Sequence, residues 1–234
     1  MGNLMEFLRG NIWHVAPILI AGVIAIAISF ERFKALMWVY PLGNPAAFFE
    51  KLRDLVMADR LAEAIALCDR YRSKLVPQVV REGLLRAHQP ETLIEDGLAI
   101  AVSEQGQKVS KRTPFLATIA NVSTLLGLLG TIVGLIHSFE AVGKASAQEK
   151  SALLAAGIST AMNATMLGLA VAIPCMILFS YFMNKSNRLS VEIDQAAIRT
   201  LDLIKQRYYA AEAESINEPG EGGGRSKFPM SKVV

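Results

Sequence analysis

The chain has 234 residues, of which 52% are hydrophobic and only 19% are charged. This apolar share, with a mean hydropathy of +0.35, exceeds that of an ordinary soluble domain and indicates membrane segments. The net charge of +3 is too small for the concentrated basic face of a nucleic-acid-binding protein. The only two cysteines, Cys68 and Cys175, lie in a polar and an apolar stretch, which excludes a disulfide framework or a cysteine-based metal site.

Three runs without a charged residue account for most of the excess hydrophobicity. They are Val15–Phe30, Thr113–Phe139 and Ser151–Asn184. About 20 apolar residues cross a hydrocarbon core of roughly 30 Å, so the second and third runs predict transmembrane helices. The first run is shorter, and a signal peptide is the alternative to a true span. Trp38 and Tyr40 beyond it resemble an interfacial anchor, and no small-residue cleavage site follows the run, which favours a span.

The orientation is predicted from the positions of Lys and Arg. Residues 31–112 hold thirteen of these and the segment after Asn184 holds eight, whereas the N-terminus and the 140–150 loop share only Arg9, Lys144 and Lys150. Basic residues collect in cytoplasmic loops. We therefore expect the N-terminus and the short loop to lie in the periplasm, and the long first loop and the C-terminus in the cytoplasm.

The long loop and the C-terminal segment show helical periodicity. Apolar residues recur at helical spacing from Phe48 to Val102, without the alternation of a strand. Six residues after the third run continue one stripe, whose partner is either the first-loop helices or other copies of the chain; they are Leu189, Ile193, Ala197, Leu201, Ile204 and Tyr208. The expected fold is an all-α integral membrane protein with three transmembrane helices, long helices that extend into the cytoplasm and a small helical cytoplasmic region.

The expected organisation divides the chain into seven parts. They are an outward N-terminus with the first transmembrane helix (1–40), a cytoplasmic helical loop domain (41–112), the second transmembrane helix (113–139), a short periplasmic loop (140–150), the third transmembrane helix (151–184), a cytoplasmic helix extension (185–214) and a Gly-rich disordered tail (215–234).

Polar and small residues mark one face of the second run. Asn121, Thr124, Thr131 and Ser138 recur at intervals of three and seven, and glycines lie among them at Gly127, Gly130 and Gly134. Gly130 and Gly134 have the small-xxx-small spacing that lets membrane helices approach closely.

The third run carries a small-residue face as well. Ala161, Thr165, Gly168 and Ala172 form it, and Thr160 and Asn163 lie on another side. Two interpretations stay open for the threonines. Each hydroxyl could bond the carbonyl one turn back in its own helix, or Thr131 and Thr165 could line a wet path or an oligomer axis.

Neither the second nor the third run contains an acidic residue. Glu31 closes the first run and is expected to face headgroups or to pair with Arg32 or Lys34; Glu140 follows the second run, and His137 is expected to be a loop-proximal polar residue. A proton path across a membrane usually needs a group that changes its protonation state. If protons cross here, another protein is expected to supply the carboxylate.

Two motifs carry a resemblance to a known family. They are Phe-Leu-Ala-Thr-Ile-Ala at 115–120 with Gly-Leu-Leu-Gly-Thr-Ile-Val-Gly-Leu-Ile-His-Ser-Phe at 127–139, and Gly-Ile-Ser-Thr-Ala-Met-Asn-Ala-Thr-Met-Leu-Gly-Leu-Ala-Val-Ala-Ile-Pro at 157–174. In this order, and with three spans around a large first loop, the chain resembles the MotA/TolQ/ExbB proton-channel family, specifically an ExbB/TolQ-like subunit. The sequence-level match covers roughly residues 110–185.

The resemblance implies a homopentamer in the bacterial cytoplasmic membrane. It implies that the pentamer surrounds the single transmembrane helices of an ExbD/TolR-like partner, and that protons reach an intramembrane Asp on that partner while the complex does mechanical work. Thr131 and Thr165 fall on the family's threonines and are then expected to face the pore, and Thr160 is expected to line the proton pathway with them.

One position departs from the pattern of the resembled proteins. ExbB and TolQ carry a glutamate five residues before the third-span threonine, and this chain has Thr160 there. The departure implies a heavier dependence on the partner's carboxylate, and it makes a motility motor more plausible than the transport branches.

The expected function is that of a pore-forming subunit of a motor driven by the proton-motive force, in biopolymer transport, envelope energisation or motility. The alternative is a passive scaffold that clamps partner helices without conducting ions. An enzyme is the weakest option, since the sequence lacks a P-loop, a Gly-x-Ser-x-Gly and a His-Glu-x-x-His motif. No cofactor and no metal site is expected.

Overall fold

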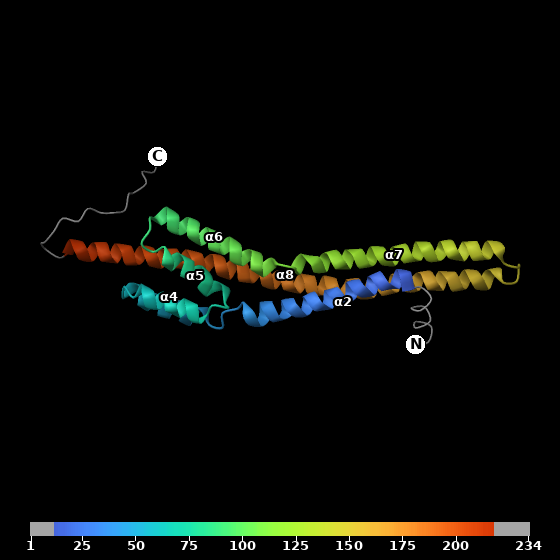
Figure 1. Ribbon diagram of the computed structural model, residues 1–234, viewed down its shortest axis with the longest axis horizontal. Coiled ribbons are helices and arrows are strands. Elements are labelled where there is room, and N and C mark those ends of the chain that lie inside the picture. Colours follow the sequence, from blue (N-terminus) through green and yellow to red (C-terminus); the bar gives the residue numbers. More distant parts are fainter. Residues whose placement is uncertain (1–11, 218–234) are drawn as a thin grey trace, which may run out of the picture. The chain divides into compact units, whose positions relative to one another are not determined.

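The computed structural model describes residues 12–217, and all regular structure in this range is helical. In chain order, the helices are α2 (Ile12–Lys34), the π-helix η1 (Ala35–Val39), α3 (Pro45–Met57), α4 (Leu61–Arg70), α5 (Leu75–Leu85), α6 (Glu91–Ser110), α7 (Thr113–Lys144) and α8 (Lys150–Asn217) (Figure 1). The expected all-α class is therefore confirmed for the described part of the chain. The N-terminus before residue 12 and most of the expected disordered tail lie outside it.

Contacts divide the described chain into two compact units. The first, the apolar unit, comprises residues 12–34 and 111–184, and therefore α2, α7 and the first half of α8. The second, the polar unit, comprises residues 35–110 and 185–217, and therefore η1, α3 to α6 and the second half of α8. The stripe that begins at Leu189 thus belongs to the same unbroken helix as the third apolar run.

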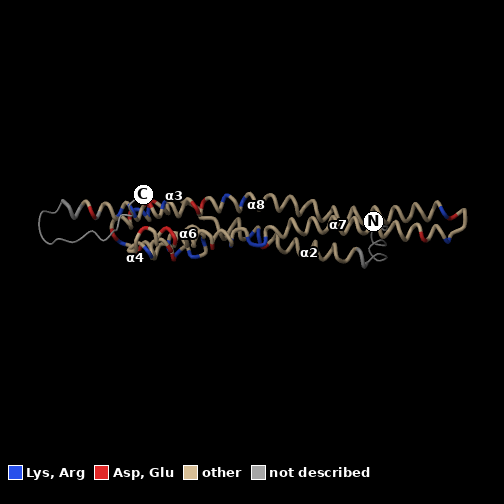
Figure 2. Tube along the Cα trace, turned by 90° about the horizontal axis from the view of Figure 1, so that it is seen from above, with Lys and Arg blue, Asp and Glu red and all other residues tan. Residues whose placement is uncertain are grey.

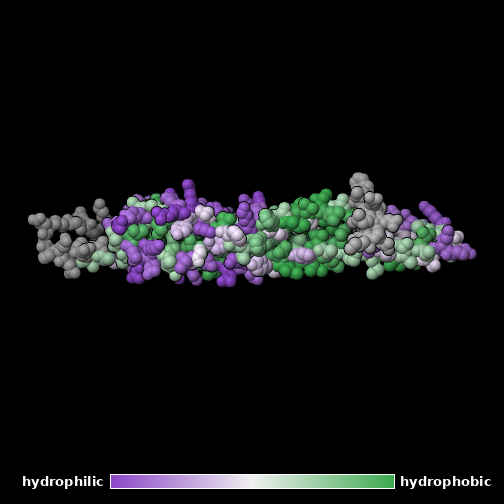
Figure 3. Space-filling view, turned by 90° about the horizontal axis from the view of Figure 1, so that it is seen from below, coloured by the Kyte–Doolittle hydropathy of each residue, from purple (hydrophilic) through white to green (hydrophobic). Residues whose placement is uncertain are grey.

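Three helical stretches are long and apolar enough to cross a membrane. They are Val15–Val39, Glu91–Lys144 and Lys150–Ala210. Along α2, α7 and the first half of α8 the trace is almost free of charged residues, which reappear where α7 meets α8 (Figure 2). In the space-filling view, hydrophobic surface gathers over part of the apolar unit, and hydrophilic residues return at the end of the α7–α8 hairpin (Figure 3). The hydrophobic part is the outward-facing apolar surface that a helix bundle presents to lipid.

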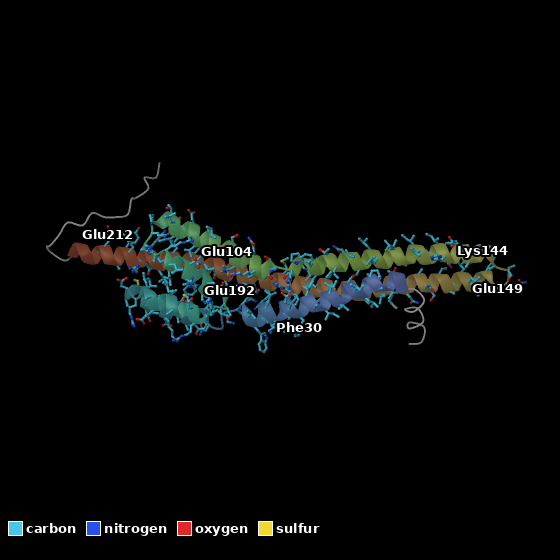
Figure 4. The ribbon with its side chains drawn as sticks, in the orientation of Figure 1. Phe30, Glu104, Lys144, Glu149, Glu192 and Glu212 are labelled. Carbon is cyan, nitrogen blue, oxygen red and sulfur yellow. The ribbon has the colours of Figure 1, made fainter. Side chains whose placement is uncertain are left out.

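Within the apolar unit, α2 packs on the other two helices along a narrow stripe. Val15 and Ile18 of α2 are buried, and Val15 shares a small core with Ala164 and Leu167 of α8. The opposite side of α2 is exposed; its Phe30 points away from the helix (Figure 4). A helix that buries one stripe of side chains and exposes apolar side chains elsewhere is typical of a transmembrane helix whose outer side contacts lipid.

A short connection joins α7 to α8. It spans residues 145–149, because α7 continues to Lys144 and α8 begins at Lys150. In this turn the hydroxyl of Ser146 donates to the carboxylate of Glu149 over 2.7 Å, and the amide of Glu149 donates to the Ser146 carbonyl. The connection is therefore shorter than the predicted loop of residues 140–150, and α7 and α8 run antiparallel as a hairpin (Figure 1).

The polar unit is built from short amphipathic helices around the second half of α8. Asn44 starts α3 by accepting a hydrogen bond from the amide of Ala47 over 3.2 Å, and Pro45 occupies the first turn. Apolar side chains from each helix form the core; they include Phe48, Leu52, Val56, Ala64, Val79, Val80, Leu84, Ile94, Leu98, Leu189, Ile193 and Ile204.

Polar contacts tie the loop helices to α8. The Arg207 guanidinium bonds the Asp59 carboxylate with Nε 2.8 Å from Oδ1, and the ammonium of Lys205 pairs with Glu91. Gly83 of α5 packs against Thr200, where an added methyl group would lie 2.9 Å from the threonine methyl. Leu189, Ile193 and Ile204 of the α8 stripe are therefore covered within their own chain, the first of the two partners that the sequence left open, whereas Ala197, Leu201 and Tyr208 are half-buried.

Candidate proton-path site at the α7–α8 seam

The closest approach of two helices in the apolar unit lies along the glycines of α7. A methyl group on Gly130 would lie 2.7 Å from the Ala164 methyl, and one on Gly134 would lie 3.1 Å from the Ala161 methyl. A methyl group on Gly168 would lie 2.6 Å from the backbone oxygen of Ser123, with Gly127 directly opposite. We call this contact the α7–α8 seam. All four glycines singled out from the sequence lie in it, and their spacing lets the two backbones touch.

Thr165 bridges the seam. Its hydroxyl donates a hydrogen bond to the carbonyl oxygen of Gly127 in α7 over 3.3 Å. The sequence left open a bond to its own helix one turn back, and the structure shows a bond to the neighbouring helix instead. Because Gly127 has no side chain, its carbonyl is open to a donor from outside the helix.

Thr131 and Thr160 bond within their own helices. Thr131 donates to the carbonyl of Leu128 over 2.5 Å, and Thr160 donates to the carbonyl of Ala156 over 2.9 Å. Both residues are half-buried. For these two threonines the structure shows the local bond that Ser and Thr commonly form in helices. Thr165 is thus the one of the three that links α7 to α8 in the described bonds.

Two buried serines belong to the seam as well. Ser123 is fully buried opposite Gly168, and Ser138 lies against Gly157, where an added methyl group would come within 1.9 Å of the serine hydroxyl oxygen. The sequence reading placed Ser138 on the polar face but overlooked Ser123 and Gly157. No sequence signal could have paired them, because which residues of α7 and α8 lie opposite one another depends on how the two helices pack.

An ion-pair cluster lies where α2 ends and α7 begins. The Glu31 carboxylate accepts from the guanidinium of Arg112, which stands before α7, and from that of Arg32 over 3.5 Å. Arg32 is 2% exposed, whereas Glu31 and Arg112 are about half exposed. The expected pairing of Glu31 with Arg32 is present, and Arg112 is a partner that sequence neighbours did not suggest.

Polar residues also gather at the other end of the hairpin. His137 is exposed, with its Nδ1 3.8 Å from a carboxylate oxygen of Glu140 one turn later. A hollow of about 430 Å³ opens at the turn, lined by Ala141, Lys144, Ala145, Glu149, Ala152 and Leu153. Lys144 and Glu149 stand at this end in the side-chain view (Figure 4). Within residues 12–217, no group of three or more His, Cys, Asp or Glu residues is placed to hold a metal ion.

Comparison with known proteins gives a consistent picture. The model of the MotA/TolQ/ExbB proton channel family matches residues 70–195, more than half of the chain. The Tol-Pal system protein TolQ of Pseudomonas aeruginosa is 36% identical over 114 residues, which are 48% of this chain and 44% of TolQ. An ExbB homologue of Methanothermobacter thermautotrophicus is 28% identical over 207 residues, 88% of this chain and 69% of that one.

A solved structure supports the fold. The chain matches a structure of C. jejuni MotAB with a TM-score of 0.54 over 92% of this chain and 87% of that chain, at 18% identity. At this identity the likeness concerns the fold alone. The family match, by contrast, includes both polar motifs and the whole α7–α8 seam. The chain therefore belongs to the MotA/TolQ/ExbB proton channel family.

Proposed function

We propose that this chain is the pore-forming subunit of a proton-driven motor in the bacterial cytoplasmic membrane. The observation that carries the proposal is the α7–α8 seam, where threonine hydroxyls and buried serines follow closely packed glycines in a chain of the proton-channel family. A pair of helices in this contact can present hydroxyls along a pore without a buried charge. In this proposal Thr131 and Thr165 face the pore, Thr160 lies near them, and several copies, five by resemblance, surround the partner.

The titrating group is proposed to come from the partner. The apolar runs of α7 and α8 contain no Asp or Glu, and the position of the family's third-span glutamate is Thr160. A single-span partner of the ExbD/TolR type with an intramembrane Asp would supply the carboxylate that proton transfer requires. Moving one proton through about 100 mV releases about 2.3 kcal/mol, so a few protons per step exceed thermal energy.

Proton transport by the reconstituted complex tests this proposal. The chain is purified with an ExbD/TolR-like single-span protein from the same organism, placed in liposomes with an internal pH dye, and driven by a potassium diffusion potential. Thr131→Ala and Thr165→Ala are expected to stop proton uptake while the complex still assembles. Thr118→Ala is the matched control for Thr131→Ala, because the Thr118 hydroxyl, like that of Thr131, bonds its own helix, at the Pro114 carbonyl. Full transport by both variants would contradict the proposal.

The passive scaffold is the second candidate, favoured by the purely structural character of a glycine-packed seam. It predicts that the work of the complex in cells is unaffected when an uncoupler collapses the proton gradient. The motor predicts that work stops within the time of the collapse. An unrelated ATP-driven process measured in the same cells is the control for general toxicity of the uncoupler.

The proposed topology places the 145–149 turn outside and the loop helices inside. Cysteines introduced at the exposed positions Gln148 and Ser103 test it in a background without Cys68 and Cys175. A membrane-impermeant maleimide added to intact spheroplasts should label Gln148→Cys and spare Ser103→Cys. Labelling of Ser103→Cys but not of Gln148→Cys would contradict the proposed orientation.

The process that the motor energises is a further proposal. The relatives reported above by sequence carry Tol-Pal and biopolymer-transport names, whereas the motility name comes from a likeness of fold. Thr160 in place of the glutamate still separates this chain from the ExbB and TolQ pattern. Motility therefore stays a prediction beside transport and envelope energisation, and a gene deletion scored for all three would distinguish them.

A further inference from the structure

A turn with three basic residues is bonded to the end of the first apolar stretch. The turn comprises Arg70, the last residue of α4, and residues 71–74, which join α4 to α5. The amide of Lys74 closes it by donating to the Tyr71 carbonyl over 2.8 Å. The ammonium of Lys74 donates to the backbone carbonyl of Trp38 over 2.9 Å. Trp38 is the second-last residue of the stretch Val15–Val39. The bond therefore holds the turn beside the residue at which the first span ends.

The π-helix explains why that carbonyl is available. Trp38 lies in η1, where the amide of Tyr40 bonds the carbonyl of Ala35 over 3.0 Å and the helix then stops at Val39. The last carbonyls of any helix lack partners within the helix. The Lys74 ammonium supplies a partner for one of them, which fixes the position of the turn relative to Trp38.

The turn carries an excess of positive charge on a fixed backbone. The Gln78 amide donates to the carbonyl of Arg72 over 2.8 Å, which holds the turn in place. The one acid beside it, Asp69, is paired with Arg81 over 2.9 Å. The side chains of Arg70 and Arg72 are exposed, and neither forms an ion pair within the described residues 12–217. Two guanidinium groups thus face outward without a counter-charge from the described part of the chain.

Aromatic rings accompany these charges. The indole of Trp38 is 78% exposed and the ring of Tyr71 is 41% exposed, although Tyr71 also packs edge-on against Phe48 with ring centroids 6.0 Å apart. Trp and Tyr with an apolar body and a polar edge prefer the boundary between hydrocarbon and headgroups. Guanidinium groups bind phosphate with two parallel hydrogen bonds.

We propose that Trp38 and the turn of residues 70–74 bind the headgroups of anionic phospholipids in the leaflet where α2 ends. The inference rests on the membrane insertion of α2 that the proposed function assumes. An acidic protein could neutralise Arg70 and Arg72, but it would leave the exposed indole at the end of a span without a suitable environment. The headgroup layer provides phosphate for the guanidinium groups and an interface for the indole.

Quenching of Trp38 fluorescence by brominated lipids tests the inference. The chain has two tryptophans, so Trp13→Phe in the full chain leaves Trp38 as the only one. This parent is placed in phosphatidylcholine vesicles that contain the same mole fraction of dibrominated phosphatidylglycerol or dibrominated phosphatidylcholine. We expect stronger quenching by the phosphatidylglycerol, with a preference that weakens as salt rises.

Two paired variants locate the preference. In Arg70→Gln/Arg72→Gln, the two brominated lipids are expected to quench Trp38 fluorescence equally. Each basic residue near an anionic surface contributes on the order of five-fold in affinity, and this variant removes two of them. Lys51→Gln/Arg53→Gln is the matched control, because it also removes two exposed charges two residues apart, in α3, and it should keep the preference. Circular dichroism is used to check that both variants fold.

The outcomes separate this inference from the proposed function. Equal quenching of the parent by the two lipids, a preference that survives Arg70→Gln/Arg72→Gln, or its loss in the α3 control as well would each overturn the inference. These results would leave proton transport by the complex untouched. Absence of quenching by either lipid would instead contradict the insertion of α2, and with it both proposals.

Discussion

The hydroxyl of Thr165 in α8 and the carbonyl of Gly127 in α7 form a hydrogen bond across the two helices, with 3.3 Å between the oxygen atoms. The bond lies where Gly127 and Gly168 bring the backbones together. Thr165 therefore has a structural role in the hairpin beside the role proposed for it in the pore. The contribution of the hydroxyl to the hairpin can be measured, because a serine keeps the hydroxyl and a valine keeps only the shape.

We expect Thr165→Val to weaken the hairpin and Thr165→Ser to preserve it. Hydrogen bonds between membrane helices contribute about 0.6 kcal/mol on average and up to about 1.7 kcal/mol. Thr165→Val should therefore lower the free energy of unfolding in mixed micelles by about that amount. Thr160→Val is the control, because Thr160 bonds its own helix and its loss should not affect the contact with α7. An equal loss in the serine and valine variants would show that the hydroxyl is not responsible.

Gly168→Ala is expected to be a damaging methyl substitution in the seam. The new methyl group would meet the backbone oxygen of Ser123 at 2.6 Å, and a backbone atom cannot move aside as a side chain can. Overpacking of this kind costs about 1–3 kcal/mol. Thermal unfolding of the detergent-solubilised protein measures the effect. Gly143→Ala, in the partner helix α7 and with no atom within 4 Å of the added methyl group, should be close to wild type.

The Glu31–Arg112 ion pair is expected to contribute little by itself. Both side chains are nearly half exposed, and pairs of this kind contribute about 1 kcal/mol or less. A double-mutant cycle with Glu31→Gln and Arg112→Gln measures the coupling. We expect Glu31→Gln to be the costlier single change, because it also removes a partner of the buried Arg32. A larger loss from Arg112→Gln would reverse this order of importance.

Cys68 is expected to be an unreactive thiol. Burial raises its pKa to about 12, and the neighbouring Asp69 adds to the shift while Arg81 opposes it. At pH 8 the thiolate should be about a thousand-fold scarcer than for a thiol with the ordinary pKa, so labelling by a maleimide should be slow in the folded Cys175→Ser variant and fast after denaturation. Rapid labelling of the folded protein would contradict the burial of Cys68.

The same shift makes a prediction about pH. The folded chain keeps the Cys68 proton above the pH at which the unfolded chain, with a thiol pKa near 9, has lost it. The unfolded state then binds fewer protons, so the free energy of unfolding should fall as pH rises between about 9 and 12. The fall should be smaller in Cys68→Ala, when unfolding is followed across this pH range in detergent; the raised pKa of Lys205, which bonds Glu91, leaves a fall of the same sign in both proteins.

The membrane helices and the glycine contacts could be predicted because both are local properties of the sequence. A run without charges needs no knowledge of tertiary structure, and the spacing of Gly130 and Gly134 places them on one face of any helix. The helical character of the loop followed from periodicity for the same reason. The exact ends of α7 and the length of the turn after it could not be predicted from the sequence, because Lys144 can extend a helix as readily as it can occupy a loop.

The missed contacts all join residues that are far apart in sequence. Glu31 bonds Arg112, and Lys74 bonds Trp38, through bonds that depend on how the helices pack. Thr165 was ambiguous, since a threonine has an acceptor in its own helix as well as in a neighbour. The apolar stripe of α8 likewise fitted either its own loop helices or another copy, and only the buried positions of Leu189 and Ile193 distinguish the two.

The shortness of the 145–149 turn bears on how the protein is synthesised. Because α8 follows α7 almost at once, both apolar helices leave the ribosome in quick succession, and we expect them to enter the bilayer as one antiparallel pair. The glycines and serines that face each other would then meet during insertion, before lipid tails can occupy the gap between them. The backbone groups at Gly127 and Gly168, which are buried in the folded hairpin, would then be covered as soon as the two helices pair.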